Sequence, residues 1–314
     1  MDVLSDVLTV MRTGKPQGAR TQAHAPWGLR FPPGETAGCH VVLQGSCWLV
    51  PPHGEPVALN VGDVVFDPRG SEYVLTDSPG RPTTDFSPTA EVDAPQFGYV
   101  HLDGPGAETV LLCAAYQLDR ARSHPLLDDL PDLIHLPSRL GRHASLRSAI
   151  ELLGHELDNP RAGTEAILPA IVDMLLLFIL RAWHDEQADG TTPGWAAALT
   201  DPAMSTALGG IHHHPERQWT VEDLAAQAGL SRAAFAKRFT AIVGQPPLTY
   251  LTWWRMTTAA RLLRDSNVPL RTVAARSGYT SEFAFAKAFK REYGTPPGIY
   301  RRHEHDCKSA STSD

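Results

Sequence analysis

Residues 231–250, SRAAFAKRFTAIVGQPPLTY, recur fifty positions later as residues 281–300, SEFAFAKAFKREYGTPPGIY. Ten residues are identical at this constant offset, and seven of them are serine, phenylalanine, glycine, proline or tyrosine residues. These seven are Ser231, Phe235, Phe239, Gly244, Pro246, Pro247 and Tyr250, matched by Ser281, Phe285, Phe289, Gly294, Pro296, Pro297 and Tyr300. Identity at a fixed period indicates a tandem structural unit.

Each copy has the pattern of two short helices joined by a glycine turn. In the first copy Thr220 is a good N-cap, and the acidic pair Glu222-Asp223 suits the positive end of a helix. Gly229 marks the turn, because glycine adopts positive φ without strain. Ser231 caps a second helix that we expect to bury Phe235, Phe239 and Ile242, and Gly244 with Pro246-Pro247 ends it.

The second copy repeats this logic with Gly278, Ser281 and the pair Pro296-Pro297. Upstream, Leu224–Gly229 corresponds to Val273–Gly278 with the offset shortened by one. Two helices joined by a short glycine turn form the arrangement that places the second helix in a DNA major groove. The repeat therefore predicts two helix-turn-helix units, at about 220–244 and 270–294.

The distribution of charge favours the same use. The chain of 314 residues has 28 Lys and Arg against 35 Asp and Glu, a net charge of −7. Residues 216–302 hold 14 basic and 6 acidic side chains, a local net charge of +8, which leaves −15 for the remainder. A basic block on an acidic protein is typical of a phosphate-binding domain joined to a domain of another kind.

Helix periodicity predicts which side chains face the DNA. If Phe235 and Phe239 point inward, the opposite face of that helix carries a lysine that can reach guanine or phosphate. In the second unit a glutamate can accept from cytosine and a phenylalanine can contact a thymine methyl group. The predicted DNA-binding residues are Arg232, Ala233, Ala236, Lys237, Arg238, Ser281, Glu282, Phe283, Lys287, Lys290 and Arg291. A solvated helix face with ordinary surface charges is the alternative.

The residues from Trp219 to Ala225, from Ser231 to Tyr250 and from Gly278 to Arg301 resemble the AraC/XylS family of bacterial transcription regulators. The resemblance covers about residues 200–302. It implies an all-α domain of two helix-turn-helix subdomains joined by one long helix, here Thr249 to Leu263. It also implies reading of two successive major grooves on one side of the duplex. One departure is that small Ala233 and Ala236 stand where relatives often have larger base-reading side chains, so the first helix is expected to read few bases directly.

The remaining two thirds are long enough for a further domain with its own core. The N-terminus begins Met1-Asp2-Val3 and shows no basic-then-apolar secretory signal. The apolar run Ala166–Leu180 contains Asp173 and is too short for a bilayer span, so we expect a buried helix and no membrane partner. The 4 cysteines show no paired spacing and favour a reducing cytoplasm.

Residues 20–118 have an all-β pattern of short apolar runs separated by turns rich in proline and glycine. The expected strands are Cys39–Leu43, Cys47–Val50, Val64–Phe66, Tyr73–Leu75 and Thr109–Cys113. Gly62-Asp63 followed by Pro68, Gly70 and Tyr73 resembles the second cupin motif, with Tyr73 in place of a metal-binding histidine. Gly34 and His40 have the spacing that opens the first cupin motif. The region thus resembles the cupin-type sensor domain found ahead of AraC/XylS DNA-binding domains, a small β-barrel or jelly roll that can hold a ligand.

The cupin motifs lack the residues of a catalytic metal site. Val42 replaces the second histidine of the first motif, and no glutamate follows at Gln44 or Gly45. Cupin enzymes hold a metal with three or four His or Glu ligands, so we predict no catalytic residue, no metal and no cofactor. His40, Tyr73 and Cys113 are the candidate effector-binding residues, with His101 a further neighbour if it converges. A satisfied barrel histidine, metal ligation by His40 and a redox-active Cys113 remain alternatives. His212-His213-His214 is expected to end a helix before Pro215, because consecutive helix residues do not face one site.

The region between barrel and DNA-binding domain shows two helical patterns, about Ser145–Asp158 and Thr164–Glu186. The second is apolar on more than one side and must be covered, either by a second subunit in a homodimer or by its own barrel. Residues 187–193 are the expected hinge. The predicted organisation is a sensor domain at 1–137, a helical linker at 138–195, the DNA-binding domain at 196–303 and a disordered tail at 304–314.

The sequence therefore predicts a cytoplasmic α+β multidomain protein that is a sequence-specific transcription regulator, not an enzyme. Its partners would be double-stranded promoter DNA, a small-molecule, metal or oxidant effector, a second copy of the chain, and RNA polymerase if it is an activator. One alternative is a metal-dependent cupin enzyme fused to a DNA-binding domain. Another is a constitutive DNA-binding protein with a purely structural barrel.

Overall fold

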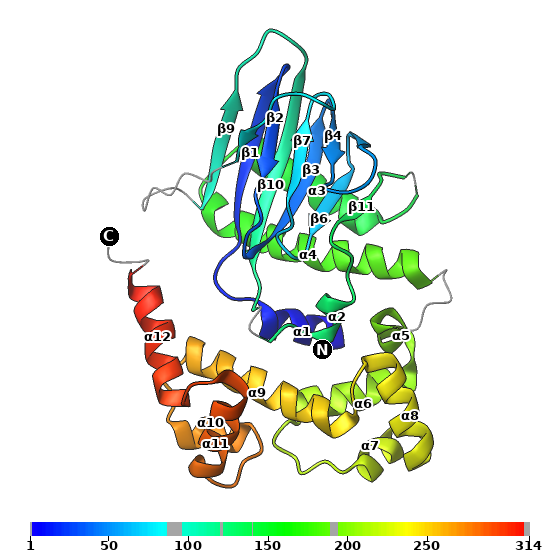
Figure 1. Ribbon diagram of the computed structural model, residues 1–314, viewed down its shortest axis with the longest axis vertical. Helices are drawn as coiled ribbons and strands as arrows, with labels where there is room; N and C mark the ends of the chain where they lie inside the picture. The colour runs from blue at the N-terminus through cyan, green and yellow to red at the C-terminus, as the bar shows by residue number, and fades with distance from the viewer. Residues whose placement is uncertain (1, 87–95, 120–121, 140, 189–193, 311–314) are drawn as a thin grey trace. The chain divides into compact units, whose positions relative to one another are not determined.

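The computed structural model describes residues 2–86, 96–119, 122–139, 141–188 and 194–310, and Figure 1 gives the order of the helices and strands. Most of the expected hinge at 187–193 and all of the last four residues lie outside these ranges. The chain forms two compact units. The sandwich unit consists of residues 12–120 and 130–190, and the helical unit of residues 1–11, 121–129 and 191–314.

The sandwich unit contains two sheets that face one another across an apolar core. Their strand orders are β11-β6-β3-β10-β1-β9 and β5-β4-β7-β2-β8. The strands are β1 (Gln17–His24), β2 (Gly28–Phe31), β3 (Thr36–Gln44), β4 (Ser46–Val50), β5 (Val57–Asn60), β6 (Val64–Asp67), β7 (Tyr73–Thr76), β8 (Thr84–Asp85), β9 (Phe97–Leu102), β10 (Glu108–Gln117) and β11 (Ile134–Leu136). The sheets share no strand, so the cupin-like region is an open sandwich and not the closed barrel that the resemblance allowed.

All five strands expected from sequence are present, as β3, β4, β6, β7 and β10. Inward-facing residues of both sheets, among them Leu29, Leu49, Val65, Leu75 and Leu111, form one buried cluster. Alternate residues of a strand point to opposite faces, and β6 and most of β3 and β10 are buried on both faces. Strand β1 (QGARTQAH), which the sequence did not reveal, carries no large apolar residue.

Two helices lie against the outer side of the six-stranded sheet in the same unit. They are α3 (Ala144–Asp158) and α4 (Thr164–Ala188), close to the bounds expected from sequence. The hydroxyl of Tyr99 donates to the Leu157 carbonyl at 3.0 Å, and that of Tyr116 donates to the Val172 carbonyl at 2.9 Å. Within the described residues, Thr164–Gln187 is the one helix long and apolar enough to cross a membrane. Its buried Leu175, Leu176 and Leu180 belong to the protein core.

The helical unit is built on the sequence repeat. Its helices are α1 (Val3–Met11), α2 (Pro125–Asp128), α5 (Trp195–Thr200), α6 (Pro202–His213), α7 (Val221–Gln227), α8 (Arg232–Val243), α9 (Pro247–Asp265), α10 (Leu270–Arg276), α11 (Glu282–Tyr293) and α12 (Pro297–Ala310). The long helix α9 joins the group α6–α8 to the group α10–α12 (Figure 1). The linking helix that the family resemblance implied is therefore present.

Two features of this unit differ from the expected organisation. Helices α1 and α2 pack in the helical unit, although their sequences flank the sandwich strands and were assigned with the sensor part. Their buried apolar residues, including Val7, Met11 and Leu126, complete the core around α6 and α9. At the other end, α12 runs to Ala310, so the segment 304–310 is helical and not a disordered tail.

Candidate functional site

The two helix-turn-helix copies share the glycine conformation and one backbone hydrogen bond of their turns. Gly229 and Gly278 have φ of +67° and +74°, in the left-handed region that favours glycine. The amide after each glycine donates to the carbonyl five residues earlier, Leu230 to Ala225 and Tyr279 to Ala274, both at 2.9 Å. The second turn has one extra residue before its serine cap. This insertion explains why the offset between the copies changes from 49 to 50 residues.

Both recognition helices start and end in the way the sequence predicted. The Ser231 hydroxyl accepts from the Ala234 amide at 3.3 Å, and the Ser281 hydroxyl accepts from the Ala284 amide at 3.1 Å. Gly244 ends α8 and Gly294 ends α11, both with positive φ. The first helix of the first copy has a capping box between Thr220 and Asp223, and these hydrogen bonds lower the pKa of the Asp223 carboxyl. The two caps and two stops fix where α8 and α11 begin and end.

The inward and outward faces of the recognition helices are as predicted. Phe235, Phe239, Phe285 and Phe289 are fully buried, whereas Phe283 is 81% exposed. Ile242 is only half-buried, and its neighbour Val243 fills the core in its place. The predicted DNA-facing residues are exposed on α8 and α11, except that Ala236 is half-buried: Arg232, Ala233, Lys237, Arg238, Ser281, Glu282, Phe283, Lys287, Lys290 and Arg291.

Three of the predicted basic residues are engaged by carboxylates of the same unit. Arg238 forms an ion pair with Asp201, the residue whose carboxylate caps α6. Arg232 pairs with Glu222 at 2.5 Å, and Arg291 with Glu292 at 2.9 Å. Lys237, Lys287 and Lys290 have no ion-pair partner within the described ranges. Among the predicted basic residues, the lysines are therefore the cations most available to DNA phosphates or bases.

The small residues of α8 leave a hollow on its outer face. Its volume is about 330 Å³, and Ala233, Ala236, Thr240 and Leu248 are among the residues that line it. Leu248 is 41% exposed. The hollow matches the expectation that the first recognition helix presents few long base-reading side chains, and its apolar lining suits a thymine methyl group.

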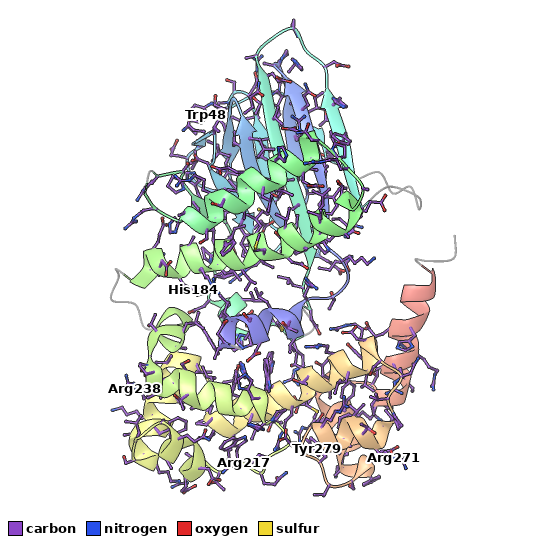
Figure 2. All side chains as sticks on the ribbon, turned by 180° about the vertical axis from the view of Figure 1, so that it is seen from behind. Trp48, His184, Arg217, Arg238, Arg271 and Tyr279 are labelled. Carbon is purple, nitrogen blue, oxygen red and sulfur yellow. The ribbon has the colours of Figure 1, made fainter. Side chains whose placement is uncertain are left out.

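Further exposed arginines that the sequence predictions did not single out lie on the helices beside the recognition helices. Arg271 and Arg276 are exposed on α10, and Arg217 precedes α7 with its guanidinium 4.0 Å above the Trp219 ring. Figure 2 shows Arg217 and Arg271 along the same edge of the helical unit. The first helix of a helix-turn-helix crosses the DNA backbone. The position of these arginines at or near the first helix of each copy is therefore a sequence signal that could have identified them.

A buried chain of hydrogen bonds surrounds Tyr250, the last residue of the first repeat. The Leu126 amide donates to His124 Nδ1 at 2.9 Å, so the ring proton lies on Nε2, which is 2.9 Å from the Tyr250 hydroxyl. The hydroxyl can then donate to His212 Nε2 at 2.7 Å. His212 Nδ1 lies 3.4 Å from an Asp6 carboxylate oxygen. The chain ties α1, α2, α6 and α9 together.

Burial keeps His124 and His212, the two histidines of this hydrogen-bonded series, neutral. His124 is completely inaccessible, and its burial holds the pKa well below 6.5. Burial also lowers the pKa of His212, although the neighbouring Asp6 carboxylate opposes this shift. His212 begins the histidine run that ends α6, in which His213 is the last helical residue and His214 is the C-cap, as the sequence predicted.

The predicted effector residues do come together inside the sandwich, but they do not converge on one point. His40 Nδ1 lies 3.0 Å from Cys113 Sγ, and His40 Nε2 lies 2.5 Å from the Tyr73 hydroxyl. The two partners therefore lie on opposite sides of the imidazole ring. The Phe31 ring packs on His40 at 4.6 Å between centroids. His101 is exposed on β9 and does not join the cluster.

This environment suits a structural role for the His40 cluster. Burial lowers the pKa of His40 to about 3 and raises that of Cys113 to about 12, so both groups are neutral at pH 7. A neutral thiol is a poor nucleophile and a poor metal ligand. No group of three or more His, Cys, Asp or Glu residues that could hold a metal occurs in the part of the chain that the structure describes.

The cupin-like glycines and aspartate have structural functions. The Gly34 amide donates to the Gly70 carbonyl at 2.9 Å, and a Cβ on Gly70 would collide with the Gly34 backbone. Asp63 accepts from the Asn60 amide at 3.0 Å and the Ser138 amide at 2.7 Å. The motif residues therefore hold turns at the edge of the sandwich.

Comparison with known proteins agrees with both halves of this description. Residues 2–185 match a family described as Cupin, and residues 224–303 match one described as Helix-turn-helix domain. A Streptomyces lividans protein described as an AraC-like transcription regulator is 36% identical over 304 residues, which cover 96% of this chain and 99% of that protein. The transcriptional regulator AlkR of Acinetobacter baylyi is 29% identical over 310 residues, covering 96% and 99%.

Among solved structures, the DNA-binding domain of the global transcriptional factor AdpA in complex with a target DNA is similar to the C-terminal part. It shares 35% identity and a TM-score of 0.33, and the match covers 35% of this chain and 97% of that domain.

Proposed function

The chain belongs to the AraC-like transcription regulators with an N-terminal cupin domain, and we propose that it binds promoter DNA through α8 and α11 under the control of an effector held by its sandwich unit. The observation that carries the proposal is the pair of structurally equivalent, capped recognition helices with exposed lysines at matching positions, Lys237 and Lys287. In this arrangement the helices enter successive major grooves about one helical turn, roughly 34 Å, apart.

Replacing Lys237 and Lys287 by alanine is expected to weaken binding to the protein's own promoter. A lysine that contacts guanine contributes about 1–3 kcal/mol to discrimination. If the lysine contacts a phosphate instead, its replacement by alanine reduces the steepness of the plot of log K against log salt by about 1. Fluorescence anisotropy at several salt concentrations, with specific and unrelated duplexes, separates the two roles for each single variant.

Lys15→Ala is the matched control, since Lys15 is an exposed lysine of the sandwich unit. It should leave promoter affinity unchanged. His40→Ala should also leave it unchanged if the sandwich acts only as a sensor. Equal loss of affinity in the Lys15 and Lys237 variants would show that overall charge, and not the recognition helices, accounts for binding.

The proposal also concerns the oligomeric state and the cellular location of the protein. We infer a cytoplasmic homodimer that engages RNA polymerase if it acts as an activator. Helix α4 carries a stripe of apolar residues that are exposed or only half-buried, and α3 adds Leu152, which is 47% exposed. The stripe on α4 consists of Ile167, Ala170, Met174, Leu177 and Phe178. An unpartnered apolar stripe suits a second copy of the same face.

The dimer is tested by the oligomeric state. Sedimentation of the wild type in dilute solution should give twice the 34.2 kDa chain mass. Met174→Glu should give the monomer with its circular dichroism unchanged. A wild type that stays at the monomer mass across the concentration range would contradict the dimer and leave packing on its own sandwich as the alternative.

We also infer that the sandwich unit has no catalytic activity. One support is the His40 cluster, in which Cys113 and Tyr73 lie within hydrogen-bond distance of the two ring nitrogens of His40. Another is that the relatives are described as transcription regulators. Stoichiometric iron in the purified protein, together with turnover of a substrate, would favour a fused cupin enzyme instead.

A further inference from the structure

The sandwich unit contains a cavity that lies outside the core cluster around His40. It is bounded by the ends of β3 and β10, by the segment after β11 and by α3. Its volume is about 510 Å³, within the range of roughly 300–1,000 Å³ typical of small-molecule sites. The cavity is large enough for one drug-sized molecule.

The cavity has an apolar wall and a basic rim. Val42, Leu136, Leu146 and Ile150 supply apolar lining, and all four are buried. Four arginines line it against only two carboxylates: Arg20, Arg139, Arg142 and Arg147 against Glu151 and Asp158. One of those carboxylates, Asp158, pairs with Arg20 at 3.0 Å. The lining therefore carries an excess of positive charge on an otherwise acidic part of the chain.

The unneutralised charge lies at one end of the cavity. Arg139 and Arg147 are exposed, and neither has an ion-pair partner within the described ranges. Both lie near the start of α3, whose first turn carries the positive end of the helix dipole. An apolar wall that leads to two available guanidinium groups fits a molecule with an apolar body and one anionic head.

We propose that this cavity is the effector site and that it takes a small amphipathic carboxylate, with the carboxylate on Arg139 and Arg147 and the apolar body against α3. This proposal deepens the effector-controlled function above and rests on it. It differs from the expectation that His40, Tyr73 and Cys113 bind the effector, because those residues satisfy one another inside the packed core.

Gly154 offers a way to fill the cavity without disturbing the fold. It lies on α3 and lines the cavity, and a Cβ built there would meet only Leu43 Cδ2, at 3.8 Å. Alanine at a helical glycine stabilises the helix by up to about 1 kcal/mol. Gly154→Leu therefore adds bulk to the cavity on a site that accepts a side chain, and Gly154→Ala is its conservative partner.

The experiment is isothermal titration of the full-length protein with decanoate, 1-decanol and acetate, each below any micellar concentration. Decanoate should bind with one site per chain, 1-decanol at least tenfold more weakly, and acetate not measurably. The Arg139→Ala/Arg147→Ala variant should lose at least tenfold in decanoate affinity and retain the affinity for 1-decanol. Gly154→Leu should lose affinity for decanoate and for 1-decanol. Gly154→Ala should bind decanoate at least as well as Gly154→Leu does, and it should remain as stable as the wild type.

The control variant is Arg81→Ala, which removes an exposed arginine of the same unit outside the cavity. It should bind decanoate like the wild type. Decanoate affinity that is unchanged in Gly154→Leu, or no binding to the wild type, would overturn the proposal.

Promoter binding by the same preparations separates this proposal from the proposed function. Retained specific DNA binding without decanoate binding would refute only the cavity assignment. Decanoate binding that follows the predicted pattern without any specific DNA binding would refute the regulator function instead.

Discussion

Phe289→Ala should lower the unfolding free energy of the helical unit by about 3–5 kcal/mol, the cost of deleting a buried aromatic side chain from a packed core. Phe289 is fully buried. Its ring stacks on Tyr293 at 4.6 Å and meets Tyr300 edge-on at 5.4 Å between centroids. Truncation leaves a cavity in the second helix-turn-helix, so promoter binding should fail because α11 is no longer held in place.

Phe283→Ala, on the same helix, is the matched variant. Phe283 is 81% exposed, so its replacement should change unfolding by no more than about 0.5 kcal/mol. Promoter affinity should nevertheless fall if the ring contacts a thymine methyl group. The midpoint of denaturant unfolding, read by far-ultraviolet circular dichroism, gives the stability, and anisotropy gives the affinity. Equal destabilisation by the two substitutions would show that the inward and outward faces of α11 are assigned incorrectly.

Lowering the pH from 7.5 to 5.5 should destabilise both units, by about 1.4 kcal/mol for each strongly buried histidine. His40 in the sandwich has its pKa lowered by burial to about 3, and burial holds that of His124 in the helical unit well below 6.5. In the unfolded chain each imidazole has a pKa of about 6.5 and binds a proton over this interval. The unfolded state therefore takes up more protons, and stability falls as the pH falls through 6.5.

His124→Asn tests the contribution of the helical unit. Asparagine is a strong N-cap, so it can replace His124 Nδ1 as acceptor of the Leu126 amide while removing the titrating ring. The groups that face His124 are Tyr250 and, beyond it, His212 with Asp6. The variant should be less stable than the wild type at pH 7.5, yet its melting temperature should fall less between pH 7.5 and 5.5. An identical pH dependence in the two proteins would contradict a buried neutral His124.

The repeat made the helical unit predictable to the level of individual side chains. Serine caps, glycine stops and buried phenylalanines are local requirements of a short helix, so Ser231, Gly244 and Phe239 were sufficient to place α8. The engagement of Arg238 by Asp201 was not predictable, because the partner lies 37 positions earlier on a helix whose packing the repeat does not encode.

The sandwich was predictable only where strands are strongly apolar. Strand β1 pairs with both β9 and β10 but carries mostly small and polar residues, so nothing in its pattern identified it. His40, Tyr73 and Cys113 were candidates on the condition that they converge, which the sequence does not show, and in the structure Tyr73 and Cys113 lie on opposite sides of the His40 imidazole. The packing of α1 and α2 with the DNA-binding helices depends on contacts of high sequence separation, such as His124 with Tyr250, which local patterns do not contain.

The most direct test of the central claim is the affinity of the purified full-length protein for the DNA that flanks its own gene, at one physiological salt concentration, with unrelated duplex as competitor. The account predicts specific retention, a footprint over two successive major grooves on one side of the duplex, and loss of that footprint in Lys237→Ala/Lys287→Ala but not in Lys15→Ala. Binding that is independent of DNA sequence and equally sensitive to all three lysines would contradict it.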